Sequence, residues 1–363
     1  MSEKNALVCA YLLDGKGGGE ALDWTAIDAW KPEQGLLWIH LDSTIKEAHF
    51  WLKEKSGLTA LTCDSLLDRE TRPRSTETDD GLLVILRGVN CNPGAEPDDM
   101  VAIRMLLADQ RIISMRFRIV RAIQDMRNNI EAGKGPCSAA EFLVMVAERI
   151  ADRMGDVVSE LDDNVGALED SVLTADSHEL RSQLADLRRT SISLRRYIAP
   201  QRDVLARLLI DRIGWLADTN RAHLREVAER TARFVDDIDS ARERATVTQE
   251  ELNNLLSEQM NKAMYLLSIV AAIFLPLGLL TGLLGINVGG IPGAEFKWAF
   301  AVVTVILLLI GIGLVLGGVA LGATFLLRAM NENILYYYSP SQVAAGDPPE
   351  GRRFRVGGLV VDG

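Results

Sequence analysis

Two long runs without a charged residue lie in the C-terminal part of this chain, and they constrain its fold more than any other feature. The first, Met264–Leu284, has 21 residues and is apolar on every side. At about 1.5 Å per residue it can cross a bilayer core of about 30 Å. The second, Ala299–Leu327, has 29 residues and exceeds that thickness, so part of it should tilt or emerge. The two runs predict a transmembrane hairpin, with spans at 264–284 and 299–327 and a loop at 285–298.

The charges that flank the hairpin predict its orientation. Lys262 precedes the first run, Arg328 follows the second, and further arginines lie in the tail. The connector holds only Lys297 and Glu295. The positive-inside bias therefore places both termini in the cytoplasm. The first residues lack the apolar segment of a secretory signal peptide, which agrees with a soluble part that stays in the cytoplasm.

The segment 138–263 is dominated by helix formers, and three helices are predicted at 138–172, 177–212 and 217–262. The last carries an apolar stripe whose spacing alternates between three and four residues, which is the pattern of a heptad seam. So narrow an apolar face must pack on neighbours, either within the chain or between subunits. The seam consists of Leu224, Val227, Thr231, Phe234, Ile238, Ala241, Ala245, Thr248, Leu252, Leu255 and Gln259.

The segment 1–137 mixes short apolar runs with helical stretches at 45–56 and 58–67, and this alternation predicts an α/β layer structure. Gly15–Gly19 is glycine-rich but lacks the GxxxxGK[ST] spacing of a phosphate-binding loop, so it is interpreted as a turn. The predicted strands are Ala6–Leu13, Leu36–Leu41, Leu82–Leu86, Met100–Ala108 and Ile112–Phe117.

Composition excludes several functions. The net charge of −11 argues against nucleic acid as the main partner, because phosphate binding needs a basic face. The four cysteines and four histidines are scattered without metal-ligand spacing. No nucleophile–base pair or phosphate loop is found, so the chain is not expected to be an enzyme or to hold a cofactor.

Two transmembrane helices cannot enclose a polar path alone, so a transporter would need several copies around a cyclic axis. The first span is the better pore candidate, because it continues the seam and carries small or polar residues on one stripe. The second is rich in Leu, Ile and Val and fits a lipid-facing ring. Pro276 could act as a hinge or be a fixed kink. The stripe consists of Asn261, Met264, Ser268, Ala271, Leu275, Gly278, Gly282 and Gly285.

The first span ends in Gly285-Ile286-Asn287, followed by Val-Gly-Gly-Ile-Pro-Gly. With Arg87–Asn90, Asn92–Ala95 and Tyr197–Asp203, this region closely resembles the CorA superfamily of divalent-cation transporters, and within it the zinc-transporting ZntB branch. The resemblance covers roughly residues 5–310. It implies an α+β membrane protein of the bacterial inner membrane, with a cytoplasmic α/β/α domain, a long helical stalk and a homopentameric funnel.

The resemblance also assigns roles along the pore. Asn287 from five subunits would form the outer ring that captures a hydrated cation, and carbonyls near Gly285 could add acceptors. Ile286, which replaces the family's Met, completes this entry motif. Met264 and Leu267 match the hydrophobic constriction. Gly278 replaces the family's pore threonine, which fits the zinc branch. The remaining pore positions are Asn261, Ser268, Ala271, Leu275 and Gly282, and Glu295 in the loop could attract cations.

The implied function is inward Zn²⁺ transport with proton coupling. Within the superfamily, a Mg²⁺/Co²⁺ channel or zinc efflux is the alternative, because the spans contain no voltage sensor or carboxylate relay. A non-transporting, membrane-anchored helical scaffold is a different class of function. It predicts no ion flux and no effect of changing Asn287.

The C-terminal end departs from this family. Residues from about 313 to 360 resemble the membrane anchor and first strands of the haem chaperone CcmE, and the match then stops. That family's haem-attaching histidine has no counterpart, since the last histidine here is His223, so no haem is expected. We interpret 328–363 as an atypical, fused tail that is disordered or loosely strand-like beyond residue 340.

Overall fold

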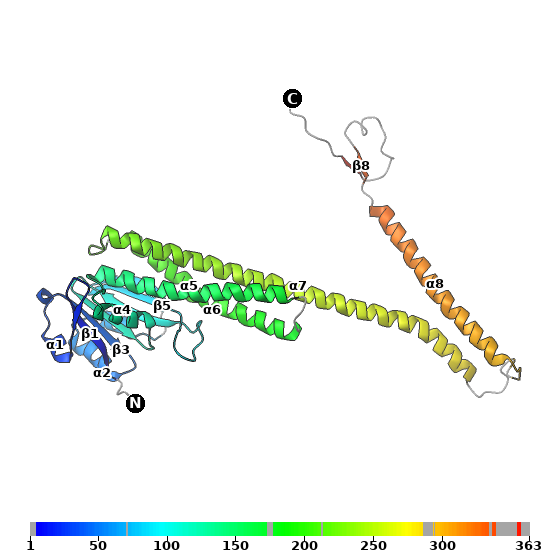
Figure 1. Cartoon of the computed structure of the whole chain (residues 1–363), viewed down its shortest axis with the longest axis horizontal. Helices are drawn as coiled ribbons and strands as arrows, with labels where there is room; N and C mark the ends of the chain where they lie inside the picture. The colour runs from blue at the N-terminus through cyan, green and yellow to red at the C-terminus, as the bar shows by residue number, and fades with distance from the viewer. Residues whose placement is uncertain are drawn as a thin grey trace, which may run out of the picture. The chain divides into compact units, whose positions relative to one another are not determined.

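The computed structural model describes residues 5–69, 72–172, 177–211, 213–285, 293, 295–333, 336–338 and 354–356. The chain divides into two compact units, Met1–Leu255 and Leu256–Gly363. The first unit contains a seven-stranded sheet and a helical bundle, and the second contains the long apolar helices (Figure 1).

The sheet is mixed, with the strand order β2-β1-β3-β7-β6-β5-β4. Strands β3 and β7 are parallel, and every other neighbouring pair is antiparallel. All five strands expected from apolar runs are present. The bounds are β1 Leu7–Leu13, β2 Gly19–Ala21, β3 Leu36–Asp42, β4 Arg74–Thr78, β5 Gly81–Gly88, β6 Val101–Leu107 and β7 Arg111–Arg116.

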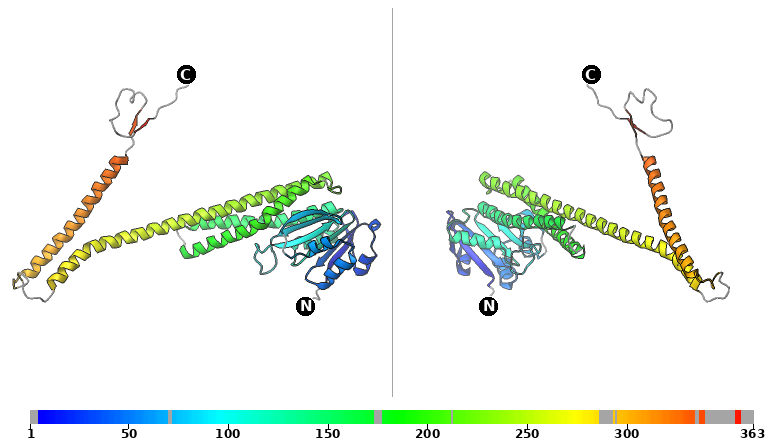
Figure 2. Two further views of the ribbon diagram at one scale, coloured as in Figure 1. Left: turned by 180° about the vertical axis from the view of Figure 1, so that it is seen from behind. Right: turned by 45° about the vertical axis from the view of Figure 1, so that its right-hand side comes forward.

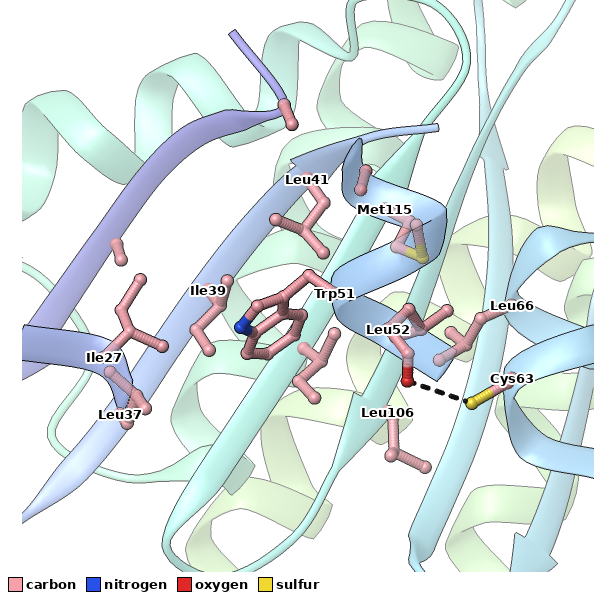
Figure 3. Packing of buried hydrophobic residues seen from close by; sticks show 14 of the residues in the cluster. Ile27, Leu37, Ile39, Leu41, Trp51, Leu52, Cys63, Leu66, Leu106 and Met115 are labelled. Atoms are coloured by element: carbon pink, nitrogen blue, oxygen red, sulfur yellow. Dashed lines mark hydrogen bonds between the residues drawn. The ribbon is translucent and has the colours of Figure 1, made fainter. Parts of the chain in front are cut away.

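Short helices cover one face of the sheet and long helices cover the other. On the first face, Trp51, Leu52 and Leu66 pack against strand residues such as Ile39 and Met115 (Figure 3). On the other face, Phe142 of α5 lies 5.0 Å from the ring of Trp38. The α/β/α arrangement is therefore confirmed. The first face carries α1 (Trp24–Ala29), α2 (Lys46–Phe50), the π-helical turn η2 (Trp51–Lys55) and α3 (Ala60–Leu67); a 3₁₀ turn, η1, spans Pro32–Gln34; α4 (Arg121–Glu131) lies with α5 on the second face.

Two strands had no signal in the sequence. Strand β2 begins inside the glycine-rich turn, where Gly15 and Gly17 have φ angles of 70° and 99°, a region that glycine adopts without strain. The turn itself is as expected. Strand β4 is an edge strand of mostly polar residues, so it lacks the apolar run by which strands are recognised.

Three long helices form the bundle, α5 (Ala139–Ser171), α6 (Ser177–Ile210) and α7 (Asp218–Gly285), and they lie side by side in the views of Figure 2. Ser138 caps α5 by accepting a hydrogen bond from the backbone N–H of Glu141, a favourable N-terminal arrangement. The heptad seam of α7 is buried from Leu224 to Leu252, apart from the half-buried Phe234, and is exposed by Gln259. This part of the seam therefore packs within its own chain.

The second unit contains the distal part of α7 and helix α8 (Ala299–Asn333). Among the described residues, α7 and α8 are the two helices long and apolar enough to cross a membrane. Pro276 lies inside α7 without ending it. In the tail, β8 (Tyr336–Tyr338) pairs in parallel with β9 (Phe354–Val356), and the rest of the predicted loose tail lies outside the described residues.

Candidate functional site

The predicted pore stripe lies on the distal part of α7, where nearly every described residue is exposed, on the stripe and beside it. Every member that the structure describes is exposed, from Asn261 to Gly285. Their spacing of three and four residues keeps them on one side of the helix. Ile286 and Asn287 lie outside the described residues, so the predicted outer ring has no geometry here. The exposed stripe comprises Asn261, Met264, Leu267, Ser268, Ala271, Leu275, Gly278, Gly282 and Gly285.

A different side of α7 contributes to a groove with α8. Ile273, Leu277 and Thr281 line this groove together with residues of α8 that include Thr304 and Gly311. Its volume is about 640 Å³ and its lining is mostly apolar. Positions 273 and 277 are two residues beyond 271 and 275, which at about 100° per residue turns them roughly 200° from those two positions, whereas Thr281 lies only about 60° from Gly278, near the edge of the stripe. Helix α8 thus contacts the side of α7 that the stripe leaves free.

The hydroxyl groups of the spans hydrogen-bond to their own helices. Ser268 donates to the carbonyl of Met264 at 2.8 Å, and Thr281 donates to that of Leu277 at 2.9 Å. Thr304 donates to Phe300 at 2.8 Å. With its proton engaged, the Ser268 oxygen presents only lone pairs to the exposed side, which suits a cation or its hydration water.

Charged groups occur only beside the spans. Lys262 forms an ion pair of 2.7 Å with Glu258, and this hydrogen bond lowers the pKa of the Glu258 carboxyl. Glu295 and Lys297 in the connector are exposed. The spans themselves, 264–284 and 299–327, contain no Asp, Glu, Lys, Arg or His. A cation moving along the stripe would therefore meet amide, hydroxyl, carbonyl and apolar groups.

Acidic side chains of the bundle are partly paired with arginines. Arg244 of α7 pairs with Asp162 and Glu169 of α5 at 2.6 and 2.5 Å, and lowers the pKa of Glu169. Arg195 of α6 pairs with Asp239 at 2.6 Å. Within the described ranges, no group of three or more Asp, Glu, His or Cys side chains is placed to hold a metal.

Sequence reasoning assigned no role to Thr281 and Thr304, which lie in the groove between α7 and α8. The signal for Thr281 was present, because Ile273, Leu277 and Thr281 recur every four residues along one side of the helix. It was masked because the groove side is otherwise apolar, and a single threonine in an apolar span does not mark a face.

Comparison with known proteins bears on this arrangement. Residues 33–317 match the family described as CorA-like Mg²⁺ transporter protein. The divalent cation transporter CmaX of Pseudomonas aeruginosa is 38% identical over 302 residues, which are 82% of this chain and 91% of that protein. The zinc transport protein ZntB of Yersinia enterocolitica is 37% identical over 306 residues, or 84% of this chain and 92% of that one.

The fold of this chain also resembles those of solved structures. Full-length CmaX superposes with a TM-score of 0.73 at 38% identity, covering 91% of this chain and all of that one. The magnesium transporter CorA from Methanocaldococcus jannaschii has a TM-score of 0.73 at 21% identity, covering 85% of this chain and 96% of its own. At that identity the second likeness concerns the fold alone.

Proposed function

Because the chain belongs to the CorA-like Mg²⁺ transporter family, we propose that it carries divalent cations across a bacterial inner membrane, with Zn²⁺ as the main cargo. Both termini lie in the cytoplasm in this proposal. The observation that carries it is the uncharged, exposed stripe of α7, which lies on the side that α8 leaves free. Copies of this stripe around a common axis would line one continuous path.

Five copies form that path in our proposal, with Asn287 at its outer mouth. An amide oxygen accepts hydrogen bonds from the water around a cation without stripping the first shell. Below it the stripe offers Gly282, Gly278 and Ser268, then the apolar side chains of Leu267 and Met264. The apolar ring closes the path by dewetting when its side chains approach one another.

Zinc is favoured over magnesium by two features. ZntB of Yersinia enterocolitica is a zinc transport protein of 37% identity over most of both chains. Gly278 supplies no hydroxyl at the level where the family's magnesium transporters are expected to have one, so the pore has fewer oxygens to replace the tightly held water of Mg²⁺.

Proton coupling is the most detailed part of the proposed function. The spans contain no carboxylate or histidine, so a proton taken up during transport must bind outside them. We propose that zinc enters with protons, and the groups beside the stripe, such as Glu258 and Glu295, are the candidates for that binding.

The test uses the purified full-length chain in liposomes that enclose a zinc-sensitive dye. We expect zinc entry to rise with a proton gradient directed inward, and Asn287→Ala to reduce it. Asn254→Ala is the matched control, because this exposed asparagine of α7 lies outside the stripe. Entry that Asn287→Ala leaves unchanged would exclude the outer ring, and entry independent of the gradient would exclude the coupling.

The same liposomes decide between the alternatives. A magnesium dye that responds more strongly than the zinc dye would make the protein a magnesium channel. The absence of flux for every divalent cation would favour a membrane-anchored scaffold. The mass of the detergent-solubilised particle, measured by light scattering, tests the pentamer independently of transport.

A further inference from the structure

A pocket of about 410 Å³ opens in the first unit, between α1, the turn η2 and the beginnings of β3 and β7. Its floor is apolar and comes from the sheet, and its walls include two indole rings. Figure 3 shows the ring of Trp51 next to Ile39, with Leu37 and Ile27 on the other side of Ile39. The volume falls within the range of small-molecule sites in proteins. The residues used below are Asp28, Trp30, Trp51, Lys55 and Arg111.

Arg111, the first residue of β7, brings a partly desolvated positive charge to this pocket. Its guanidinium donates one hydrogen bond of 2.8 Å to the carbonyl of Ser56. In the described part of the chain, no carboxylate forms an ion pair with it. The neighbouring Asp80 instead accepts hydrogen bonds from the backbone N–H and the hydroxyl of Thr59. Burial lowers the pKa of Arg111, as expected for a cation that is only partly compensated.

The other charges at the pocket cancel. Lys55 pairs with Asp28 at 2.8 Å, and the hydrogen bond from Lys55 lowers the pKa of the Asp28 carboxyl. Both residues are about half exposed, so they form the rim of the pocket. Arg111 is therefore the cation of the pocket that no ion pair engages among the described residues; the nearby Asp80 carboxylate offsets part of its charge, and Arg111 still has unused N–H donors among its five.

The indole rings have already engaged their polar atoms. The Nε1 of Trp30 donates to the carbonyl of Gly35 at 3.2 Å, and the Nε1 of Trp51 donates to Asp28 at 3.4 Å. Trp51 is 7% exposed and its ring also packs on Trp24, at 5.4 Å between centroids, so most of the ring surface toward the pocket comes from the half-buried Trp30 and a smaller part from Trp51. Flat apolar faces beside a guanidinium suit a ligand that combines a ring with an anionic group.

The backbone at the pocket is unusual in the same place. Residues Trp51–Lys55 form a π-helical turn, closed by a hydrogen bond of 3.0 Å from the N–H of Ser56 to the carbonyl of Trp51. Single π-helical turns are rare in proteins, but those that occur are frequently found at functional sites. This turn carries Trp51 and Lys55, and it ends at Ser56, whose carbonyl holds Arg111.

We propose that this pocket binds a small organic anion with a flat ring, its carboxylate on Arg111 and its ring against Trp30 and Trp51. The site is separate from the cation path and does not depend on which ion the protein transports. All its residues belong to the first unit, so its ligand would act as an effector rather than as cargo.

The test is titration calorimetry on the full-length chain in detergent, with indole-3-acetate as the probe. The neutral indole-3-acetamide and inorganic phosphate are the comparison ligands. We expect indole-3-acetate to bind with a dissociation constant below about 1 mM, and the amide at least tenfold more weakly, which corresponds to about 1.4 kcal/mol. Phosphate should bind more weakly than the aromatic acid because it cannot use the rings.

Variants localise the binding. Arg111→Gln should weaken the binding of indole-3-acetate at least tenfold. Arg118→Gln, which removes an exposed arginine paired with Asp99, should leave that binding unchanged. If Arg111→Gln unfolds, as judged by circular dichroism, Trp30→Ala replaces it and should weaken the acid while sparing phosphate. The proposal is overturned if indole-3-acetate and its amide bind equally well, or if both pocket variants bind indole-3-acetate as tightly as the unchanged chain does. It is also overturned if indole-3-acetate gives no heat of binding up to several millimolar.

Discussion

The imidazole Nδ1 of His40 lies 2.8 Å from the hydroxyl oxygen of Ser114, across the parallel pair of strands β3 and β7. The same oxygen accepts a hydrogen bond of 2.8 Å from the indole Nε1 of Trp38. All three side chains are fully buried. The Nε2 of His40 has no hydrogen-bond partner among the described residues, so a proton added there would be a buried, unsolvated charge.

His40 should therefore make stability fall in mild acid. Burial, followed by the charges of Arg116 and Arg127, lowers the pKa of His40 to about 3. The unfolded chain takes up this proton below about pH 6.5, while the folded chain does not until about pH 3. Between these values the unfolded state binds more protons, so we expect the free energy of unfolding to drop by about 1.4 kcal/mol per pH unit.

The measurement compares the pH dependence of unfolding of the full chain with that of His40→Leu. The difference between the two curves isolates His40, since the carboxylates contribute to both. Identical slopes for the chain and His40→Leu would show that this histidine is not the source.

Close packing of α5 on α7 gives a second prediction. A Cβ atom at Gly155 would lie 3.2 Å from the Cζ of Phe234, tighter than an ordinary contact. Gly155→Val should therefore destabilise the bundle by about 1–3 kcal/mol through overpacking. Gly166→Val is the matched control on the same helix, because a Cβ there would meet only Arg244, at 3.8 Å. The measurement is thermal unfolding of both variants. Equal losses of stability in the two would contradict the packing argument.

Arg104 gives a third prediction. This residue is 1% exposed, and its guanidinium donates to the carbonyls of Asp68 and Arg69 at 2.9 and 3.2 Å. It also lies 4.6 Å from the ring centroid of Phe117. Arg104→Met should remove the donor of these two hydrogen bonds and cost about 1–3 kcal/mol, measured by denaturant unfolding.

Phe117→Leu separates the two contributions of Arg104. It removes the cation–π contact but leaves the carbonyl hydrogen bonds, so we expect a loss of less than about 1 kcal/mol. A loss as large as that of Arg104→Met would mean that ring packing, not carbonyl satisfaction, dominates at this site.

The fourth prediction concerns the proposed constriction. Leu267→Ser should raise zinc entry into liposomes and let it persist without a gradient, because a hydroxyl ring retains water where leucine expels it. Leu266→Ser is the control at a similarly exposed residue of α7, because it lies seven residues before Ile273 and therefore on the α8 side of the helix rather than on the stripe. Unchanged flux in Leu267→Ser, or equal increases in both variants, would contradict a constriction at Leu267.

Gly278 tests selectivity within the same assay. Gly278→Thr adds a hydroxyl to the stripe, in open space where a Cβ meets no neighbour within 4 Å. We expect the ratio of magnesium to zinc entry to rise, because Mg²⁺ depends on oxygen groups that replace or orient its water. A lower or constant ratio would show that this position does not set selectivity.

The sequence alone determined the periodic features of this protein. The apolar strand runs, the three bundle helices, the seam from Leu224 to Leu252 and the two uncharged runs all repeat a local pattern. Such patterns can be recognised in the sequence because a single helix or strand is apolar along one continuous face, or, in a membrane span, on all sides. The resemblance around Gly285-Ile286-Asn287 was equally local, and it pointed to the family that the comparisons show.

Only the tertiary structure decided which elements meet. The seam of α7 could have packed on its own chain or on a neighbour, and its burial within one chain settled this for Leu224–Leu252. The partners of Gly155, Arg104 and Arg111 lie on other elements, far away in the chain. Strand β4 and the pocket between η2 and β7 had no sequence signal for the same reason. Contacts between distant segments depend on how faces are matched in space, and no local period encodes that matching.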